Sequence, residues 1–321
     1  MARIIGTGSY LPKRIVTNKE MEDFVDTTDE WIVSRTGIKE RHISDENENT
    51  GDLGYEAART ALDDAGIKAE EIDYILVATT TPNALVPNTS SYIQDKLGAV
   101  NAACLDLNAA CTGFIYGLEV AEGLLKSDHI HQILVIGSEV LTKITDFTDR
   151  ATCVLFGDGA GAAVLTKGDG IRGIVTGADG TRGACLSTGD FPVNNILQEG
   201  SSAPQLVRMD GKEVYKFAVN ILPESLKAAV ERGNGKIDEL DHIVPHQANI
   251  RIIEAASKRL NISMDKFFVN IHKTGNTSSA SIAIALDEMN KSSLLKNGDK
   301  MALVGFGGGL TYGAVYMEWN R

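Results

Sequence analysis

The chain of 321 residues repeats one structural pattern, and this repetition limits its possible folds more than any other feature. An apolar strand, a stretch of small residues, a helical pattern and a second apolar strand follow one another twice, over 102–138 and over 267–307. The helical patterns span 112–126 and 278–289, and the second copy opens with an expected strand at 267–271. We therefore predict a duplicated α/β unit whose two halves pack about a pseudo-twofold axis.

A polar, glycine-containing turn at 167–170 separates the two copies. We accordingly place an N-terminal half at 1–167 and a C-terminal half at 168–321. Strands that alternate with helices predict mostly parallel sheets with helices on both faces. Two polar segments, 11–48 and 178–204, fall outside the repeat, and insertions of this kind are where substrate contacts usually gather.

Charge and cysteine content exclude several classes of function. The formal net charge is −12, which opposes nucleic-acid binding, and residues 169–321 are neutral, so residues 1–168 hold the whole excess. The four cysteines show no CxxC spacing, which predicts a reducing, cytoplasmic location and no metal site. The N-terminus lacks a signal-peptide core and no apolar run is long enough for a membrane span, so we expect no membrane partner.

Cys111 is the first candidate for chemistry. It lies between a strand and a helix, and its small neighbours permit a sharp turn. Because a helix N-terminus stabilises a thiolate, we expect Cys111 to ionise more easily and to be better exposed than a core thiol. The alternative is a cysteine that packs as a small hydrophobic group, which is how we interpret the other three cysteines.

His246 and Asn276 are the next candidates. His246 closes an apolar run, and Asn276 lies in the small-residue segment of the second copy, the counterpart of the segment that holds Cys111. If the two segments face a common axis, the three side chains converge, as nucleophilic catalysis requires. Singly, such a histidine is more often structural and such an asparagine is more often a helix cap. The glycine-rich loop 305–313 suits either a tight turn or backbone amides that donate to an oxyanion.

Five motifs occur in order along the chain. They are Asp106-Leu-Asn-Ala-Ala-Cys-Thr-Gly-Phe, Phe156-Gly-Asp-Gly-Ala-Gly-Ala-Ala-Val-Leu, Pro245-His-Gln-Ala-Asn-Ile-Arg-Ile, Asn276-Thr-Ser-Ser-Ala-Ser-Ile and Gly305-Phe-Gly-Gly-Gly-Leu-Thr-Tyr-Gly-Ala. Together they resemble β-ketoacyl-[acyl carrier protein] synthase III, and the likeness runs from Gly6 to the C-terminus. The resemblance implies a thiolase-like α/β fold layered α-β-α-β-α, a homodimer, and the condensation that initiates type II fatty acid synthesis.

The resemblance also implies a role for each candidate, without a cofactor or a metal. Cys111 would take the acyl group of an acyl-CoA, and His246 and Asn276 would hold the thioester of malonyl-acyl carrier protein. The amides of Cys111 and Gly308 would hold the oxyanion formed during acyl transfer. A thiolate suits this chemistry because it attacks a thioester well and also leaves well.

Related condensing enzymes differ at the same positions. Thiolases carry a second cysteine ahead of the terminal glycines, where this chain has Gly305-Phe306, and elongating synthases carry a second histidine in place of Asn276. Two alternatives stay open. One is a polyketide- or quinolone-type condensing enzyme that prefers malonyl-CoA, and the other is a non-catalytic acyl-binding homologue.

A segment beginning at Asp29 resembles the CoA-binding segment of the family. The likeness implies that Trp31 and Arg150 stack about the adenine and that Thr27 and Arg35 contact the nucleotide. Asn249 resembles the residue that contacts the pantetheine. The alternative for Trp31 is an ordinary buried aromatic side chain.

Basic residues on two expected helices form what we call the basic surface. It comprises Arg251, Lys258 and Arg259 on one helix and Lys212 and Lys216 on the other. A basic helix face is usually just solvated. In an acidic chain, beside the candidate histidine, it is also a plausible docking surface for an acidic carrier protein.

Val86 departs from the family pattern. In relatives a bulky aromatic residue often precedes the proline equivalent to Pro87 and closes the acyl pocket across the dimer. The smaller valine predicts a deeper pocket that accepts longer or branched primers beside acetyl.

Overall fold

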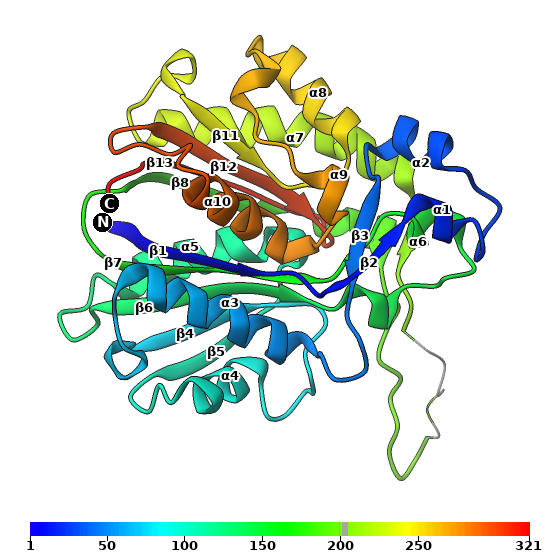
Figure 1. Ribbon diagram of the computed structural model, residues 1–321, viewed down its shortest axis with the longest axis horizontal. Coiled ribbons are helices and arrows are strands. Elements are labelled where there is room, and N and C mark those ends of the chain that lie inside the picture. Colours follow the sequence, from blue (N-terminus) through cyan, green and yellow to red (C-terminus); the bar gives the residue numbers. More distant parts are fainter. Residues whose placement is uncertain (199, 201–204) are drawn as a thin grey trace.

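The computed structural model describes residues 1–198, 200 and 205–321, and its helices and sheets alternate in five layers (Figure 1). Two β-sheets lie one above the other, with helices between them and on both outer faces. The described residues include no helix long and apolar enough to cross a membrane, and no cluster of His, Cys, Asp and Glu fit to hold a metal ion.

The first sheet is built from residues of the N-terminal part of the chain. Its strands, in spatial order, are β1 (Ala2–Tyr10), β7 (Gly159–Lys167), β6 (Gln132–Glu139), β4 (Tyr74–Ala78) and β5 (Ala103–Leu107). Helices α3 (Thr50–Ala65) and α4 (Thr89–Leu97) cover its outer face and bury an aliphatic cluster against it. Helix α3 packs so closely on β1 that a Cβ at Gly8 would lie 2.2 Å from the Ala57 carbonyl.

The second sheet follows the same plan. Its strands, in spatial order, are β11 (His242–Pro245), β12 (Lys300–Gly307), β13 (Thr311–Glu318) and β8 (Ile171–Ala178). Helices α7 (Gly211–Arg232) and α8 (Ile250–Leu260) cover its outer face. The proposed division at 167/168 lies between the last strand of the first sheet and the first strand of the second.

The central layer consists mainly of α5 (Gly113–Leu124) and α10 (Ser281–Lys291). Both helices bury aliphatic side chains against both sheets, and they form one continuous core. A helix covered on both sides must be apolar nearly all round, as α5 is. Each of these helices begins just after one of the two repeated small-residue segments, so both segments lie at the same end of the central layer.

The prediction of mostly parallel sheets is wrong, because both sheets are mixed. Strand β4 runs parallel to β5 and β6, and β11 runs parallel to β12, whereas β7 runs antiparallel to β1 and β6. Strands β12 and β13 are also antiparallel, since the short turn 308–310 joins them and leaves no room for a crossover helix.

The strand expected at 267–271 is reduced to one bridge between Ile243 and Phe267. The side chain of Gln247 replaces the missing strand partner. Its amide donates to the Phe268 carbonyl, and its oxygen accepts from the backbone N–H groups of Asn270 and Ile271. The backbone polar groups are therefore satisfied without a ladder.

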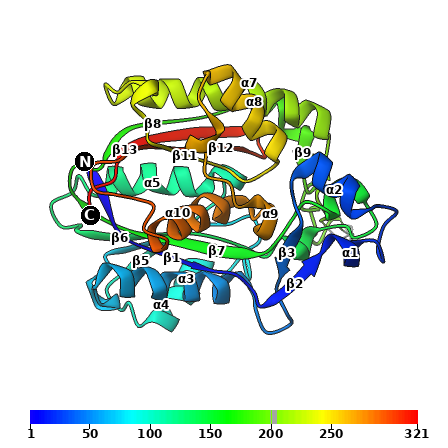
Figure 2. The ribbon, with the colours of Figure 1, turned by 45° about the horizontal axis from the view of Figure 1, so that its top comes forward.

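The polar segment 11–48 forms a small unit at one end of the layers, to the right in Figure 2. It contains the hairpin of β2 (Arg14–Thr17) and β3 (Glu40–Ile43) and the helices α1 (Asn18–Met21) and α2 (Asp29–Thr36). The remaining short elements are α6 (Arg150–Cys153), α9 (Ile271–Thr274), β9 (Leu186–Ser187) and β10 (Arg208–Met209). Of the second polar segment, 178–204, residues 199 and 201–204 lie outside the described residues.

Candidate active site

One cavity of about 620 Å³ lies where the two repeated segments meet. Seven of the predicted site residues line it: Cys111, His246, Asn276, Gly308, Trp31, Arg35 and Asn249. The other predicted residues do not line it: Thr27, Arg150, Val86, Lys212, Lys216, Arg251, Lys258 and Arg259. The structure thus places Cys111, His246 and Asn276 in the wall of one cavity, as their placement in the sequence predicts.

Cys111 lies in a 3₁₀ turn, Ala110–Thr112, that leads directly into α5. Cys111 is only 8% exposed. Burial raises the pKa of its thiol to about 12, although a hydrogen bond with Ser278 opposes this rise. The expectation of an exposed, easily ionised cysteine is therefore wrong. Desolvation of the thiolate outweighs the help of the helix N-terminus.

His246 follows β11, and its backbone N–H donates to the Val304 carbonyl at 2.8 Å. The ring nitrogen Nδ1 lies 2.6 Å from the Ser281 hydroxyl, which leaves Nε2 as the nitrogen that can act in the cavity. The ring also meets the edge of Phe306, with centroids 5.6 Å apart. Burial lowers the pKa of His246 to about 3, so the imidazole is neutral near pH 7.

Asn276 follows Gly275, whose φ of +64° suits glycine. The Asn276 side-chain oxygen accepts from the Ser278 N–H at 2.9 Å, and this fixes the carboxamide with its NH₂ group as the remaining donor. The side-chain oxygen of Asn276 therefore acts as the expected cap, and its NH₂ group remains available in the cavity.

The two segments are related residue by residue in the structure. Ala110 and Ser278 both have left-handed φ angles, of 46° and 48°, and each is the first residue of a 3₁₀ turn that leads into a central helix. Asn108 and Asn276 each accept a hydrogen bond from the backbone N–H two residues later. Asn276 is therefore the counterpart of Asn108, and the residue that matches Cys111 is Ser279.

The glycine-rich loop packs directly against the Cys111 turn. A Cβ at Gly307 would lie 2.6 Å from the Cys111 nitrogen, so only glycine permits this approach. The Thr311 hydroxyl lies 3.1 and 3.0 Å from the carbonyls of Ala109 and Gly308, and it can donate its one hydrogen to either of them at the contact between loop and turn. The backbone amides of Cys111 and Gly308 therefore belong to neighbouring segments at the cavity wall.

The mouth of the cavity is formed by the small N-terminal unit. The Arg150 guanidinium lies 4.9 Å from the Trp31 ring centroid and donates to the Asp26 carbonyl, and Arg35 lies 6.0 Å from the same ring. Trp31 is half-buried and is thus not an ordinary core aromatic residue. The buried Thr27 hydroxyl has no hydrogen-bond partner among the described residues.

Asn249 ties this mouth to the second half of the chain. It caps α8 by accepting from the Arg251 N–H, and its side-chain NH₂ donates to the Arg35 carbonyl at 2.9 Å. One hydrogen of that NH₂ group remains for a ligand, since a carboxamide carries two donors.

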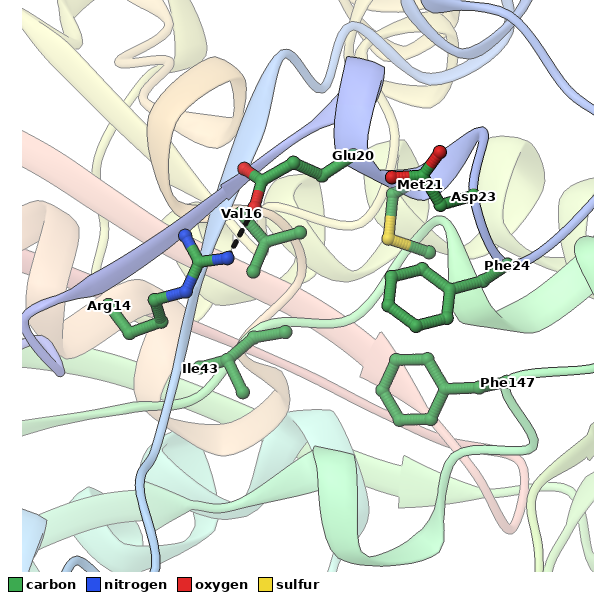
Figure 3. Close-up of a pocket in the computed structure, with 8 residues that line it drawn as sticks. All are labelled: Arg14, Val16, Glu20, Met21, Asp23, Phe24, Ile43 and Phe147. Atoms are coloured by element: carbon green, nitrogen blue, oxygen red, sulfur yellow. Dashed lines mark hydrogen bonds and ion pairs between the residues drawn. The ribbon is translucent and has the colours of Figure 1, made fainter.

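Several cavity residues were missed by sequence reasoning. The apolar wall includes Phe156, Leu186, Phe191, Val207 and Phe306. Their segments are far apart in the chain, and no pattern in the sequence marks them as one surface. A second, smaller cavity of about 280 Å³ lies beside the Arg14–Glu20 ion pair, between the rings of Phe24 and Phe147 and the β2–β3 hairpin (Figure 3), and none of the predicted site residues lines it.

The high pKa of the Cys111 thiol predicts the pH dependence of its alkylation. Only the thiolate reacts, so the rate of modification by iodoacetamide should rise about tenfold per pH unit throughout the neutral and mildly alkaline range. Intact-mass kinetics at a series of pH values would measure this rate for the cavity thiol. A plateau below pH 8 would show that the resting thiol is already activated.

Comparison with known proteins identifies the family. The family models "3-Oxoacyl-[acyl-carrier-protein (ACP)] synthase III" and its C-terminal part match residues 105–180 and 230–319. The β-ketoacyl-[acyl-carrier-protein] synthase III of Clostridium acetobutylicum is 53% identical over 324 residues, covering 99% of this chain and 98% of that protein.

Solved structures agree with this assignment. The crystal structure of the synthase III from Aquifex aeolicus is similar with a TM-score of 0.92 and 43% identity, over 99% of this chain and all of that one. The priming β-ketosynthase of the R1128 polyketide pathway has a TM-score of 0.92 and 38% identity, over 100% of this chain and 97% of that one. The chain is therefore a thiolase-fold condensing acyltransferase, and it belongs to the β-ketoacyl-[acyl-carrier-protein] synthase III family.

Proposed function

We propose that Cys111, His246 and Asn276 carry the reaction of this family in this chain. An acyl-CoA primer and malonyl-acyl carrier protein condense with loss of CO₂ to 3-ketoacyl-acyl carrier protein and CoA, which initiates fatty acid synthesis. The observation that supports this assignment is the meeting of a thiol, an imidazole, a carboxamide and a glycine-rich loop at one cavity. The family reaction needs no resident cofactor, since both substrates are already activated as thioesters.

The first half-reaction transfers the acyl group to Cys111. The sulfur attacks the thioester carbonyl of the primer, the new thioester bond forms, and CoA leaves as its thiol with the proton. The backbone amides of Cys111 and Gly308 donate to the oxygen that becomes negative during this step. These amides are fixed in place by the close packing of Gly307 on the Cys111 turn, so no reorganisation is needed as charge develops.

The second half-reaction uses the neutral His246 and Asn276. Both donate a hydrogen bond to the malonyl thioester oxygen, which gains negative charge when CO₂ leaves. The resulting carbon nucleophile attacks the acyl group on Cys111, and the Cys111 sulfur departs. Because decarboxylation generates the nucleophile, no strong base is required, and a histidine whose pKa is about 3 serves as a donor only.

The cavity mouth suits the CoA end of the primer. Trp31 and Arg150 offer a flat ring and a guanidinium for the adenine, while Arg35 and Thr27 supply donors for the nucleotide portion. Asn249 reaches the pantetheine with its second NH₂ hydrogen.

The proposal is tested by separating the two half-reactions. An acyl-CoA alone should release one CoA per active site, and the 3-ketoacyl product should form only after malonyl-acyl carrier protein is added. A protein that binds acyl-CoA without releasing CoA would be the non-catalytic homologue. A protein that condenses faster with malonyl-CoA than with the carrier-bound form would be the polyketide-type alternative.

The basic surface is proposed as the landing site for the carrier protein. All five of its side chains are exposed, and Arg251 lies over the Tyr215 ring at 5.9 Å, next to a residue that lines the cavity. Lys216 is partly neutralised by Glu213, and Arg259 contacts Asn220. Arg251 is therefore a member of the surface that contacts a residue of the cavity wall and has no acidic partner among the ion pairs of the described residues.

Reversal of charge at Arg251 should affect only one half-reaction. We expect Arg251→Glu to lower kcat/KM for malonyl-acyl carrier protein by about 10-fold or more, because opposed charges steer this encounter, and to leave acylation by acyl-CoA unchanged. Lys126→Glu, an exposed change at the far end of α5, is the matched control. Equal loss of both half-reactions in Arg251→Glu would contradict carrier docking at this surface.

The assembly is proposed to be a homodimer in the cytoplasm. Strand β5 is an edge strand paired only with β4, so its free edge can pair with a second copy of the chain. Leu105 on this strand is 41% exposed. Leu85, Val86 and Val100 are exposed as well. The cysteines Cys104, Cys111, Cys153 and Cys185 are all free thiols, in keeping with a reducing compartment.

Val86 should influence primer choice only through such a dimer. It is 86% exposed and does not line the cavity of its own chain, so it can narrow only the cavity of a partner. We expect Val86→Phe to reduce turnover of butyryl-CoA and isobutyryl-CoA by about 10-fold relative to acetyl-CoA, since overpacking a pocket is costly. The three turnover rates should be measured on samples whose oligomeric state is determined by sedimentation. An unchanged ranking in a dimeric variant would contradict the role.

A further inference from the structure

A buried carboxyl group lies behind the Cys111 turn, at the end of β6. Glu139 is fully buried, and it is the only glutamate among the described residues that the structure buries completely. Its oxygen Oε2 accepts from the hydroxyls of Thr81, Thr80 and Thr79, at 2.7, 3.1 and 3.2 Å. The backbone N–H of Thr80 also donates to the carboxyl group.

No cation is hydrogen-bonded to Glu139 among the described residues. The titratable groups that face it are Cys111, from the turn before α5, and Lys143, from the turn after β6. The Lys143 ammonium is already directed to other acceptors, at 2.6 to 3.2 Å. They are the Asn49 side chain, the Thr50 hydroxyl and the carbonyls of Thr81 and Pro82. A buried carboxylate without a bonded cation is costly, and burial raises the pKa of Glu139.

The hydrogen bonds of the Ser279 hydroxyl indicate the protonation state of Glu139. Its oxygen lies 2.8 Å from the Ala78 carbonyl and 2.9 Å from Glu139 Oε1. A carbonyl and a carboxylate can only accept, and a serine has one hydrogen to donate. Both contacts are hydrogen bonds at once only if Oε1 carries the proton, so that Glu139 donates to Ser279 and Ser279 donates to Ala78.

We propose that Glu139 is a neutral, protonated positioning residue that fastens the Ser279 turn to the end of β4. This turn follows Asn276 by three residues and precedes Ser281, which holds the His246 ring, by two. One hydrogen-bonded chain, from Glu139 through Ser279 to Ala78, thus orients both donors of the second half-reaction. The proposal rests on the roles proposed above for His246 and Asn276.

The neutral form also matters for Cys111. An ionised Glu139 is one of the groups that would raise the pKa of the Cys111 thiol, and it would so oppose formation of the attacking thiolate. A protonated carboxyl group still accepts the threonine hydrogen bonds at Oε2 and donates to Ser279 from Oε1, without this field. Glutamine is the closest mimic of that form, because its NH₂ group donates where Oε1–H donates and its oxygen accepts where Oε2 accepts.

Two variants and one spectrum test the proposal. Glu139→Gln should keep condensation within about threefold of the wild-type rate, whereas Glu139→Leu should lose about 10²-fold in condensation because the turn shifts. The pH profile of Cys111 alkylation should be the same in Glu139→Gln and wild type. A profile displaced to lower pH, or a loss in Glu139→Gln as large as in Glu139→Leu, would show that the charge is present and would overturn the proposal.

Infrared spectroscopy of the wild-type protein tests the protonation directly. At neutral pH we expect the C=O stretching band of a protonated carboxyl group, shifted when glutamate is labelled with heavy carbon in its carboxyl group and absent from Glu139→Gln. Absence of a label-sensitive band in the wild type would refute the protonated state. This measurement needs no catalysis, so it can fail while the proposed function holds, and it can succeed if the function fails.

Discussion

Replacement of Cys111 by alanine should abolish the acyl-enzyme and lower the overall condensation rate by about 10⁴-fold or more. The reason is that the cavity offers no second thiol, since none of the other cysteines lines it. Cys153→Ala is the matched control, because Cys153 is also a buried cysteine but does not line the cavity. CoA release and product formation should both be measured. Near-normal CoA release by Cys111→Ala would show that another group accepts the acyl chain.

His246→Ala and Asn276→Ala should separate the two half-reactions by slowing condensation and sparing acylation. Loss of one donor to a developing oxyanion costs about 10²- to 10³-fold, so each variant should slow condensation by that factor. Acylation of Cys111 should stay within about threefold of the wild-type rate, because neither side chain is needed to attack the primer.

Ser281→Ala should slow condensation less than His246→Ala does. It keeps the imidazole but removes the hydroxyl 2.6 Å from its Nδ1, so we expect a smaller loss, of about 10-fold. Stopped acylation in His246→Ala would mean that the histidine acts as a base toward Cys111. That result would contradict its assignment as a donor to the malonyl thioester.

The duplicated α/β plan and the meeting of the candidate side chains were accessible from the sequence because the chain is duplicated, whereas the layered thiolase-like fold was expected from the family resemblance. Two corresponding turns, each leading into a helix of the central layer, lie at the same end of that layer, which brings Cys111 and Asn276 together. Strand direction was less accessible. It depends on the connections that join neighbouring strands, and the tight turn between β12 and β13 reverses the chain, so these two strands run antiparallel.

The environment of the site could not be predicted from local patterns. Burial of Cys111 depends on how the glycine-rich loop and the Ser278 turn close over it, and both come from the other half of the chain. The partners of His246 and Glu139 lie 35 and 140 residues away. Only Glu139 left a signal in the sequence, namely an acidic residue that directly ends a buried apolar strand.

The central claim is that an acyl group passes through Cys111 on its way to the carrier-bound product. Intact-mass measurement after incubation with acetyl-, butyryl- and isobutyryl-CoA should show one added acyl group on the wild type and none on Cys111→Ala. A chase with malonyl-acyl carrier protein should return the wild type to its original mass while the 3-ketoacyl product appears. No adduct on the wild type, or an adduct that the chase leaves in place, would contradict this account.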